Sequence, residues 1–203
     1  MKKGGFIKDA LVLFIITLIS GLLLGAVYDI TKAPIEAAEN KAKQAAYLKV
    51  FPEAKNFEEN PAETEKISAM AEELLNQGFG NVLINEVVTA KDSGGNTVGR
   101  VVTSTSKEGY GGNIKVSVGI DAEGTITGIT FLTLAETPGL GMRAQNESFY
   151  GQFANKKVEK FSVTKTPASS DDQINAISGS TITSNAVTNA VNAALYFNKA
   201  LNQ

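Results

Sequence analysis

The segment from Ser178 to Ser184 concentrates side chains that could carry a phosphate group. It reads SGSTITS and places five hydroxyls around Gly179, directly before an apolar helical pattern. A helix N-terminus offers unpaired N–H groups and roughly half a positive charge, and together these features bind phosphate. Serine and threonine are also preferred N-cap residues, so the segment could serve only to begin the helix. The residue types alone leave both interpretations open.

A second unusual segment, ETPGLG, runs from Glu136 to Gly141. Pro138 fixes one backbone angle, and Gly139 and Gly141 can adopt positive φ and expose bare backbone. Such a loop can approach the face or edge of a flat ring, although it is also typical of a tight turn after a strand. The candidate contacts in this loop are Glu136, Thr137, Pro138, Gly139, Leu140 and Gly141.

The composition excludes most other chemistry. The chain has no Cys, which rules out disulfides, thiolate-held iron–sulfur clusters and c-type haem attachment. It has no His, which rules out the usual zinc sites, haem ligation by imidazole and Ser-His-Asp catalysis. A net charge of −2, with scattered Lys and Arg residues, argues against a nucleic-acid partner. The chemistry therefore either depends on an imported cofactor or is limited to Asp, Glu, Lys, Ser, Thr and Tyr side chains.

An uncharged apolar stretch of 19 residues, Ala10 to Tyr28, predicts a membrane-spanning helix. It would extend roughly 28 Å, close to the hydrocarbon thickness of a bilayer. The alternative is a cleaved signal peptide, but the stretch is longer than the usual apolar core of such a peptide. Positive charges precede the stretch and mixed charges follow it, so the positive-inside rule predicts a cytoplasmic N-terminus and an extracytoplasmic remainder. These charges belong to Lys2, Lys3 and Lys8 before the stretch and to Asp29, Lys32 and Glu36 after it.

The remaining segments predict an α+β domain, with helices packed on an antiparallel sheet. Helical spacing begins at Pro34, and Asn60-Pro61-Ala62-Glu63 is typical of the start of a second helix, which ends near Gly78. Four β-branched segments between Val82 and Leu134 predict strands, and a last helix follows from Ser184 to Leu201. The predicted organisation is a cytoplasmic N-terminus (1–9), a transmembrane helix (10–28), a helical membrane-proximal segment (29–79) and a functional domain (80–203).

SGSTITS resembles the flavin-attachment motif of the FMN-binding domain that is shared by the G subunit of Rnf complexes and the C subunit of the sodium-pumping NADH:quinone reductase. That motif reads roughly Asp-x-x-Ser/Thr-Gly-Ala-Thr, and this chain has NAISGST from Asn175 to Thr181. Asn175 and Ser180 depart from the motif, at its Asp and its Ala. The ETPGLG loop and the stretch GYGGNIKVSVGID, which begins at Gly109, are also similar to the family's domain. With the N-terminal anchor, the likeness covers nearly the whole chain.

The resemblance implies a flavoprotein whose FMN-binding domain occupies 80–203. In the family the final threonine of the motif carries FMN as a phosphoester, and it corresponds to Thr181. Glu136 and Thr137 are candidates for contacting the flavin ring, and Arg143 could balance phosphate or flavin charge or be an ordinary surface arginine. The short chain favours the Rnf protein over its longer relative. The other candidate FMN contacts in the motif are Ser178, Gly179, Ser180 and Ser184.

The resemblance also implies an electron-transfer subunit of a membrane complex. By this likeness, the complex couples oxidation of reduced ferredoxin and reduction of NAD to the movement of sodium or protons. The expected partners are the Rnf subunits A, B, C, D and E, membrane lipid and a flavin transferase for maturation. We expect no metal ligands in this chain and no catalysis by the chain alone. The alternatives are an anchored, cofactor-free module for assembly or sensing, and the same flavin domain in a quinone-linked relative or a standalone extracytoplasmic reductase.

Overall fold

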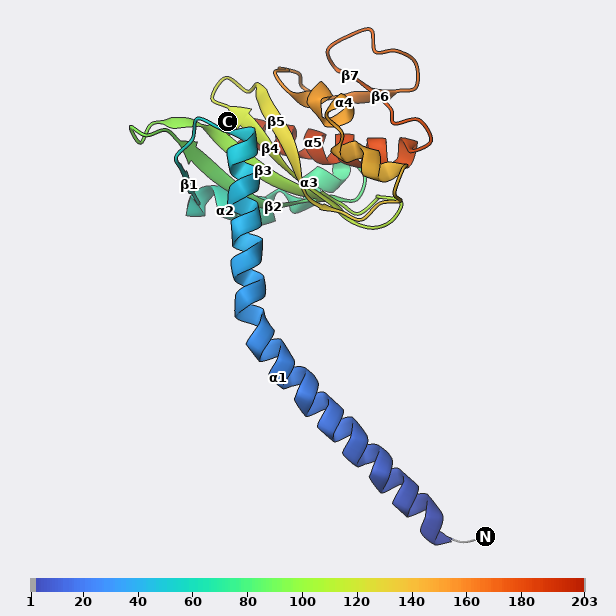
Figure 1. Ribbon diagram of the computed structural model, residues 1–203. Coiled ribbons are helices and arrows are strands. Elements are labelled where there is room, and N and C mark those ends of the chain that lie inside the picture. Colours follow the sequence, from blue (N-terminus) through green and yellow to red (C-terminus); the bar gives the residue numbers. More distant parts are fainter. Residues whose placement is uncertain (1–2, 203) are drawn as a thin grey trace. The chain divides into compact units, whose positions relative to one another are not determined.

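A computed structural model describes residues 3–202 of the protein (Figure 1). It contains two compact units, of which the first ends at Lys43 and the second begins at Gln44. The boundary therefore falls inside the first helix, and residues 44–79 belong to the same unit as the sheet. The organisation we expect from the sequence places these residues in a separate membrane-proximal segment. They join the sheet because they bury apolar side chains against it.

The helix α1 runs without a break from Lys3 to Val50. Among the described residues it is the one helix that is long and apolar enough to cross a membrane, with a mean hydropathy of 2.7 in its most apolar part. That criterion concerns length and composition only. The large apolar side chains of α1 from Phe6 to Ile30 are all exposed, from 44% for Ile15 to 80% for Phe6. Apolar surface of this extent is typical of a segment that lipid or a partner covers.

Pro34 lies inside α1 and does not begin a second helix, which corrects the sequence prediction. A proline cannot donate the backbone hydrogen bond of a helix interior and often kinks or breaks the helix. Here the flanking residues include several alanines and other good helix formers, so the helix continues through the missing bond.

The second unit is built on one antiparallel sheet with the strand order β1-β2-β3-β4-β5. The strands are β1 (Asn56–Glu58), β2 (Val82–Lys91), β3 (Thr97–Ser106), β4 (Ile114–Asp121) and β5 (Ile126–Leu134). The predicted antiparallel strands between Val82 and Leu134 are confirmed; β1 is an additional edge strand of 3 residues. Polar turns set the register. In the β2–β3 turn, Asp92 Oδ1 accepts the N–H groups of Gly94 and Asn96 at 2.8 and 2.9 Å.

Helices cover both faces of the sheet. On one face α5 (Thr181–Leu201) packs against alternate residues of the strands, such as Val102 and Val116. On the other face the last residues of α1, Tyr47 and Val50 among them, pack against Val101 and its neighbours. Successive residues of a strand point to opposite faces, which is why neighbouring valines of β3 lie in different cores.

The predicted helix that begins after Asn60 is two helices, α2 (Pro61–Ala69) and α3 (Ala71–Asn76). Asn60 caps α2 as expected, since its Oδ1 accepts the Ala62 N–H at 3.1 Å. The chain bends at Met70, and this bend places both Met70 and Leu74 in the core under β2.

The segment between β5 and α5 folds over the end of the sheet through several short elements. These are the 3-10 helix η1 (Gly141–Gln145), α4 (Glu147–Tyr150), η2 (Gly151–Phe153) and the parallel pair β6 (Ser162–Thr164) and β7 (Gln173–Asn175). Asn192 of α5 forms two hydrogen bonds with this segment. Its side chain accepts the Phe161 N–H at 2.7 Å and donates to the Phe161 carbonyl at 2.9 Å. The helix η1 is itself in contact with α5.

Candidate functional site

A tight turn delivers the chain into α5. The Ser180 N–H donates to the Ile177 carbonyl oxygen at 2.8 Å, and Gly179 has a φ of +78°. A turn with positive φ at its third residue strongly favours glycine there. Ser184 completes the turn, because its buried hydroxyl accepts the Ile177 N–H at 2.9 Å and donates to the Ser180 carbonyl at 2.9 Å. Ser184 therefore holds the backbone of the site and does not face the cleft described below.

The start of α5 is not capped by a side chain. The helix begins at Thr181, three residues before the predicted start, and Ser180 occupies the N-cap position without a capping hydrogen bond. The first bonded N–H is that of Ser184, which donates to the Ser180 carbonyl at 3.0 Å. Among the described residues, the N–H groups of residues 181–183 have no acceptor. An uncapped helix N-terminus of this kind is available to bind an anion.

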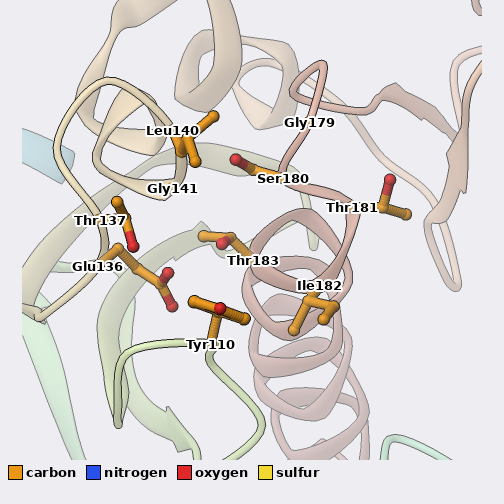
Figure 2. A pocket seen from close by; sticks show the side chains of 10 residues that line it. All are labelled: Tyr110, Glu136, Thr137, Leu140, Gly141, Gly179, Ser180, Thr181, Ile182 and Thr183. Carbon is orange, nitrogen blue, oxygen red and sulfur yellow. The ribbon is translucent and has the colours of Figure 1, made fainter.

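A cleft of about 530 Å³ lies beside this helix start (Figure 2). Three segments meet around it: the loop between β3 and β4, the loop after β5 and the first turn of α5. Its volume lies within the range of small-molecule sites. The lining residues are Tyr110, Glu136, Thr137, Leu140, Gly141, Gly179, Ser180, Thr181, Ile182 and Thr183.

The hydroxyls of SGSTITS differ sharply in accessibility. Ser180, Thr183 and Ser184 are buried, with exposed fractions of 7%, 1% and 0%. Ser178 is exposed but does not line the cleft, whereas Thr181 is half-buried and does. Within this segment, Thr181 is thus the hydroxyl that is both accessible and part of the cleft. Of the five hydroxyls in this segment, that of Thr181 is therefore the candidate for modification.

Glu136 is buried at the base of the cleft, with an exposed fraction of 7%. Its Oε1 accepts the Gly111 N–H at 3.3 Å, and its carboxylate lies against the backbone of Gly141. A methyl group built on Gly141 would come within 2.5 Å of Glu136 Oε2 and 2.6 Å of Thr183 Oγ1. Contacts this short show that the close approach of the loop to α5 needs a glycine at this position.

Three large apolar side chains form an exposed rim around the cleft. Tyr110, Leu140 and Ile182 are 73%, 45% and 54% exposed. In the described part of the second unit, the only other large apolar side chains that are as open are Leu48 and Leu75. The concentration at one place marks a surface suited to a flat apolar group.

The structure brings together seven of the residues that the sequence indicates, and the remaining candidates lie outside the cleft lining. Tyr110, Ile182 and Thr183 line the cleft but are missing from the sequence candidates. Ile182 could not be selected from the sequence, because its exposure in the first turn of α5 becomes evident only once the start of the helix is known. The candidates outside the lining are Ser178, Ser184, Pro138, Gly139 and the exposed Arg143.

The part of the chain that forms the cleft matches a known protein family. Residues 109–196 match the model of the FMN-binding domain family, and this range contains every residue that lines the cleft. The fold is thus that of an FMN-binding domain. The crystal structure of NqrC from Shewanella oneidensis aligns with a TM-score of 0.48 at 20% identity, over 58% of this chain and 61% of that chain.

Similarity to curated relatives extends over nearly the whole chain. The G subunit of the Na⁺-translocating ferredoxin:NAD⁺ oxidoreductase complex of Acetobacterium woodii is 38% identical over 197 residues, which is 93% of this chain and 89% of the relative. The G subunit of the proton-translocating ferredoxin:NAD⁺ oxidoreductase complex of Clostridium ljungdahlii is 33% identical, over 87% of this chain and 83% of the relative. The G subunit of the ion-translocating oxidoreductase complex of Methanosarcina acetivorans is 32% identical, over 93% and 92%. The chain belongs to this family, the G subunits of ion-translocating oxidoreductase (Rnf) complexes.

Proposed function

We propose that this protein is an electron-transfer subunit that carries FMN as a phosphoester on Thr181. It would work within a membrane complex that couples ferredoxin:NAD oxidoreduction to the translocation of sodium or protons. The observation that supports the attachment is the position of Thr181, a half-buried residue that lines the cleft at an uncapped helix N-terminus. Two relatives are named for different ions, so the proposal covers either ion.

The start of α5 fits the phosphate end of FMN. The free N–H groups of residues 181–183 and the positive end of the helix dipole would stabilise the negative charge of a phosphodiester. In the attachment step, Thr181 Oγ1 would pass its proton to a base of the flavin transferase and form a bond to phosphorus. The leaving group of an activated flavin phosphate departs at the same time with the electron pair of the broken bond. A flavin transferase would supply that activated flavin.

The rest of the cleft fits the flavin ring. Leu140, Ile182 and Tyr110 supply apolar and aromatic surface for its faces. Glu136 presents a carboxylate acceptor to a ring N–H, while its other oxygen is held by Gly111. When bound, FMN supplies the capacity to accept and release electrons, and this chain binds and orients it. The exposed rim would leave one edge of the ring accessible to a redox partner.

A covalent bond to phosphate suits this chain and its expected location. A dissociable cofactor is retained only when its free concentration approaches the dissociation constant, and outside the membrane free FMN is dilute. The chain has no Cys or His for a bond to the ring. An ester on Thr181 removes the dependence on free FMN and leaves the ring unlinked.

The proposed topology places this domain outside the cytoplasm, anchored by a single span of α1. The support is the apolar stretch from Ala10 to Tyr28 and the lysines before it. Its partners would be the Rnf subunits A to E, membrane lipid and, during maturation, the flavin transferase.

The attachment is tested by production of the full chain together with its flavin transferase. Intact mass and flavin fluorescence in a denaturing gel are compared for the wild type, Thr181→Ala and Thr181→Ser. We expect the wild type to carry one FMN, Thr181→Ala to carry none, and Thr181→Ser to retain attachment at least in part because it keeps a hydroxyl. Flavin retained in Thr181→Ala would move the attachment to another hydroxyl and refute the site. A wild-type chain without flavin would refute the function.

A further inference from the structure

Among the described residues that line the cleft, Ser180 is the one whose side-chain oxygen is fully buried and has no hydrogen-bond partner. Ser180 is 7% exposed, and its Oγ is buried without a hydrogen-bond partner among the described residues. Buried hydroxyls are normally paired, because an unpaired one loses its hydrogen bonds to water without replacement. The position therefore calls for a partner that is not part of the chain.

Ser180 does not serve the usual purpose of a serine at a helix start. Its backbone angles, φ −137° and ψ 47°, differ from those of a capping residue, and its side chain bonds none of the free N–H groups of the first turn. Its backbone groups are already used, the N–H by Ile177 and the carbonyl by Ser184. Only the hydroxyl remains unassigned.

The direction of the side chain identifies which part of the cofactor it would meet. Figure 2 shows the Ser180 hydroxyl on the side of Leu140, while the Thr181 side chain lies on the other side of the chain. A phosphate bound to Thr181 Oγ1 would begin on that other side. The ribityl chain then separates the ring from the phosphate, so the ring is the part of FMN that can lie between Leu140 and the tip of α5.

We propose that the Ser180 hydroxyl donates a hydrogen bond to one of the carbonyl oxygens of the flavin ring. Ser180 is thus a positioning residue that raises the reduction potential of the ring. Reduction increases the electron density on these atoms, so a donor binds the reduced ring more tightly than the oxidised ring. The inference rests on the proposed function. The motif that this segment resembles has alanine here, so the hydroxyl is a feature of this chain.

The test uses the full-length, flavin-loaded protein in detergent and compares the wild type with Ser180→Ala. The variant restores the alanine of the motif, so attachment at Thr181 is expected to be unchanged. Spectroelectrochemical titration gives the reduction potential. We expect the ratio of reduced to oxidised flavin at a fixed potential to fall by up to about tenfold, the size of one hydrogen bond. For a two-electron couple this is about 30 mV towards more negative potential.

Two further variants make the result specific to the hydroxyl. Ser180→Thr keeps the donor and is expected to restore a potential close to that of the wild type. Ser170→Ala removes an exposed hydroxyl outside the cleft and is expected to leave the potential unchanged. The ³¹P resonance of the phosphodiester is recorded for each protein and should not move in Ser180→Ala.

Several results would overturn the inference while the proposed function stands. An unchanged potential in Ser180→Ala with a shifted ³¹P resonance would place the hydroxyl on the phosphate. If neither the reduction potential nor the ³¹P resonance changes, the hydroxyl contacts neither the flavin ring nor the phosphate. Loss of flavin from Ser180→Ala alone would make the hydroxyl a requirement for attachment. Absence of flavin from the wild type would contradict the proposed function itself, and the inference would fall with it.

Discussion

The hydroxyl of Ser184 donates to the carbonyl oxygen of Ser180 at 2.9 Å and thereby closes the turn that positions the start of α5. The Ser184 hydroxyl oxygen also accepts the N–H of Ile177 at 2.9 Å. One buried side chain thus fixes both ends of the four residues that precede Thr181. The geometry of the proposed attachment site depends on this contact, although Ser184 itself lies outside the cleft lining.

Removal of this contact should loosen the turn. Ser184→Ala leaves the Ile177 N–H buried and unpaired, which lowers the free energy of unfolding by about 1–3 kcal/mol. The measurement is denaturant unfolding of the full chain in detergent, before flavin attachment. Ser148→Ala, at an exposed serine, serves as the control and should change the free energy of unfolding by less than about 0.5 kcal/mol. Equal effects of the two substitutions would contradict the role of Ser184.

The close packing of Gly141 against Glu136 should not tolerate an added methyl group. In Gly141→Ala the new methyl group would meet Glu136 Oε2 and Thr183 Oγ1, so the loop must move away from α5. We expect a loss of about 1–3 kcal/mol in the free energy of unfolding. Gly151→Ala is the matched control, since a methyl group there is 3.5 Å from Glu147 Cγ, an ordinary contact. If both variants unfold at the wild-type denaturant concentration, the close approach is not required.

The apolar rim should shield the flavin ring from solvent. Leu140→Ser removes apolar surface beside the cleft, so iodide should quench the fluorescence of the attached flavin more strongly than in the wild type. Leu75→Ser provides the control, because Leu75 is 56% exposed and lies outside the cleft lining. Equal quenching constants for the wild type and Leu140→Ser would show that the ring does not lie against this rim.

The β2–β3 turn gives a prediction on pH. Hydrogen bonds from the Asn96 side chain, from the Asn96 backbone and from Gly94 hold the pKa of Asp92 below its ordinary value. Because the folded-state pKa is depressed, the stabilisation is present above the ordinary pKa of about 3.9 and is lost as the pH falls through the folded-state pKa. NMR titration of the carboxyl carbon should show the pKa of Asp92 rising in Asn96→Ala. The exposed Asn113→Ala should leave it unchanged; a rise in both variants would contradict the assigned cause.

The sheet could be predicted from the sequence because its signals are local. The β-branched segments between Val82 and Leu134 are separated by glycine-containing turns, and each strand pairs with its neighbour in the sequence. The course of the helices depends on longer-range packing. The break between α2 and α3 at Met70 depends on which side chains enter the core. The continuation of α1 through Pro34 depends on the helix-forming residues around it. The spacing of apolar residues predicts neither feature.

The site was predictable in its two segments but not in its details. Composition and resemblance indicated the ETPGLG loop and SGSTITS, and the structure places them on opposite sides of one cleft. Tyr110 could not be selected, because its loop reaches the cleft only through the pairing of β3 with β4. The resemblance selected Thr181, but residue types alone could not rank the hydroxyls, since the burial of Ser180 and Thr183 depends on how the loop packs on α5.

The position of the flavin on the chain can be determined directly. Native protein, made with its flavin transferase, is digested with a protease, and the flavin-bearing peptide is sequenced by tandem mass spectrometry. We expect the FMN mass increment to reside on Thr181 and on no other residue of the peptide. An unmodified peptide, or an increment on Ser178, Ser180 or Thr183, would contradict it.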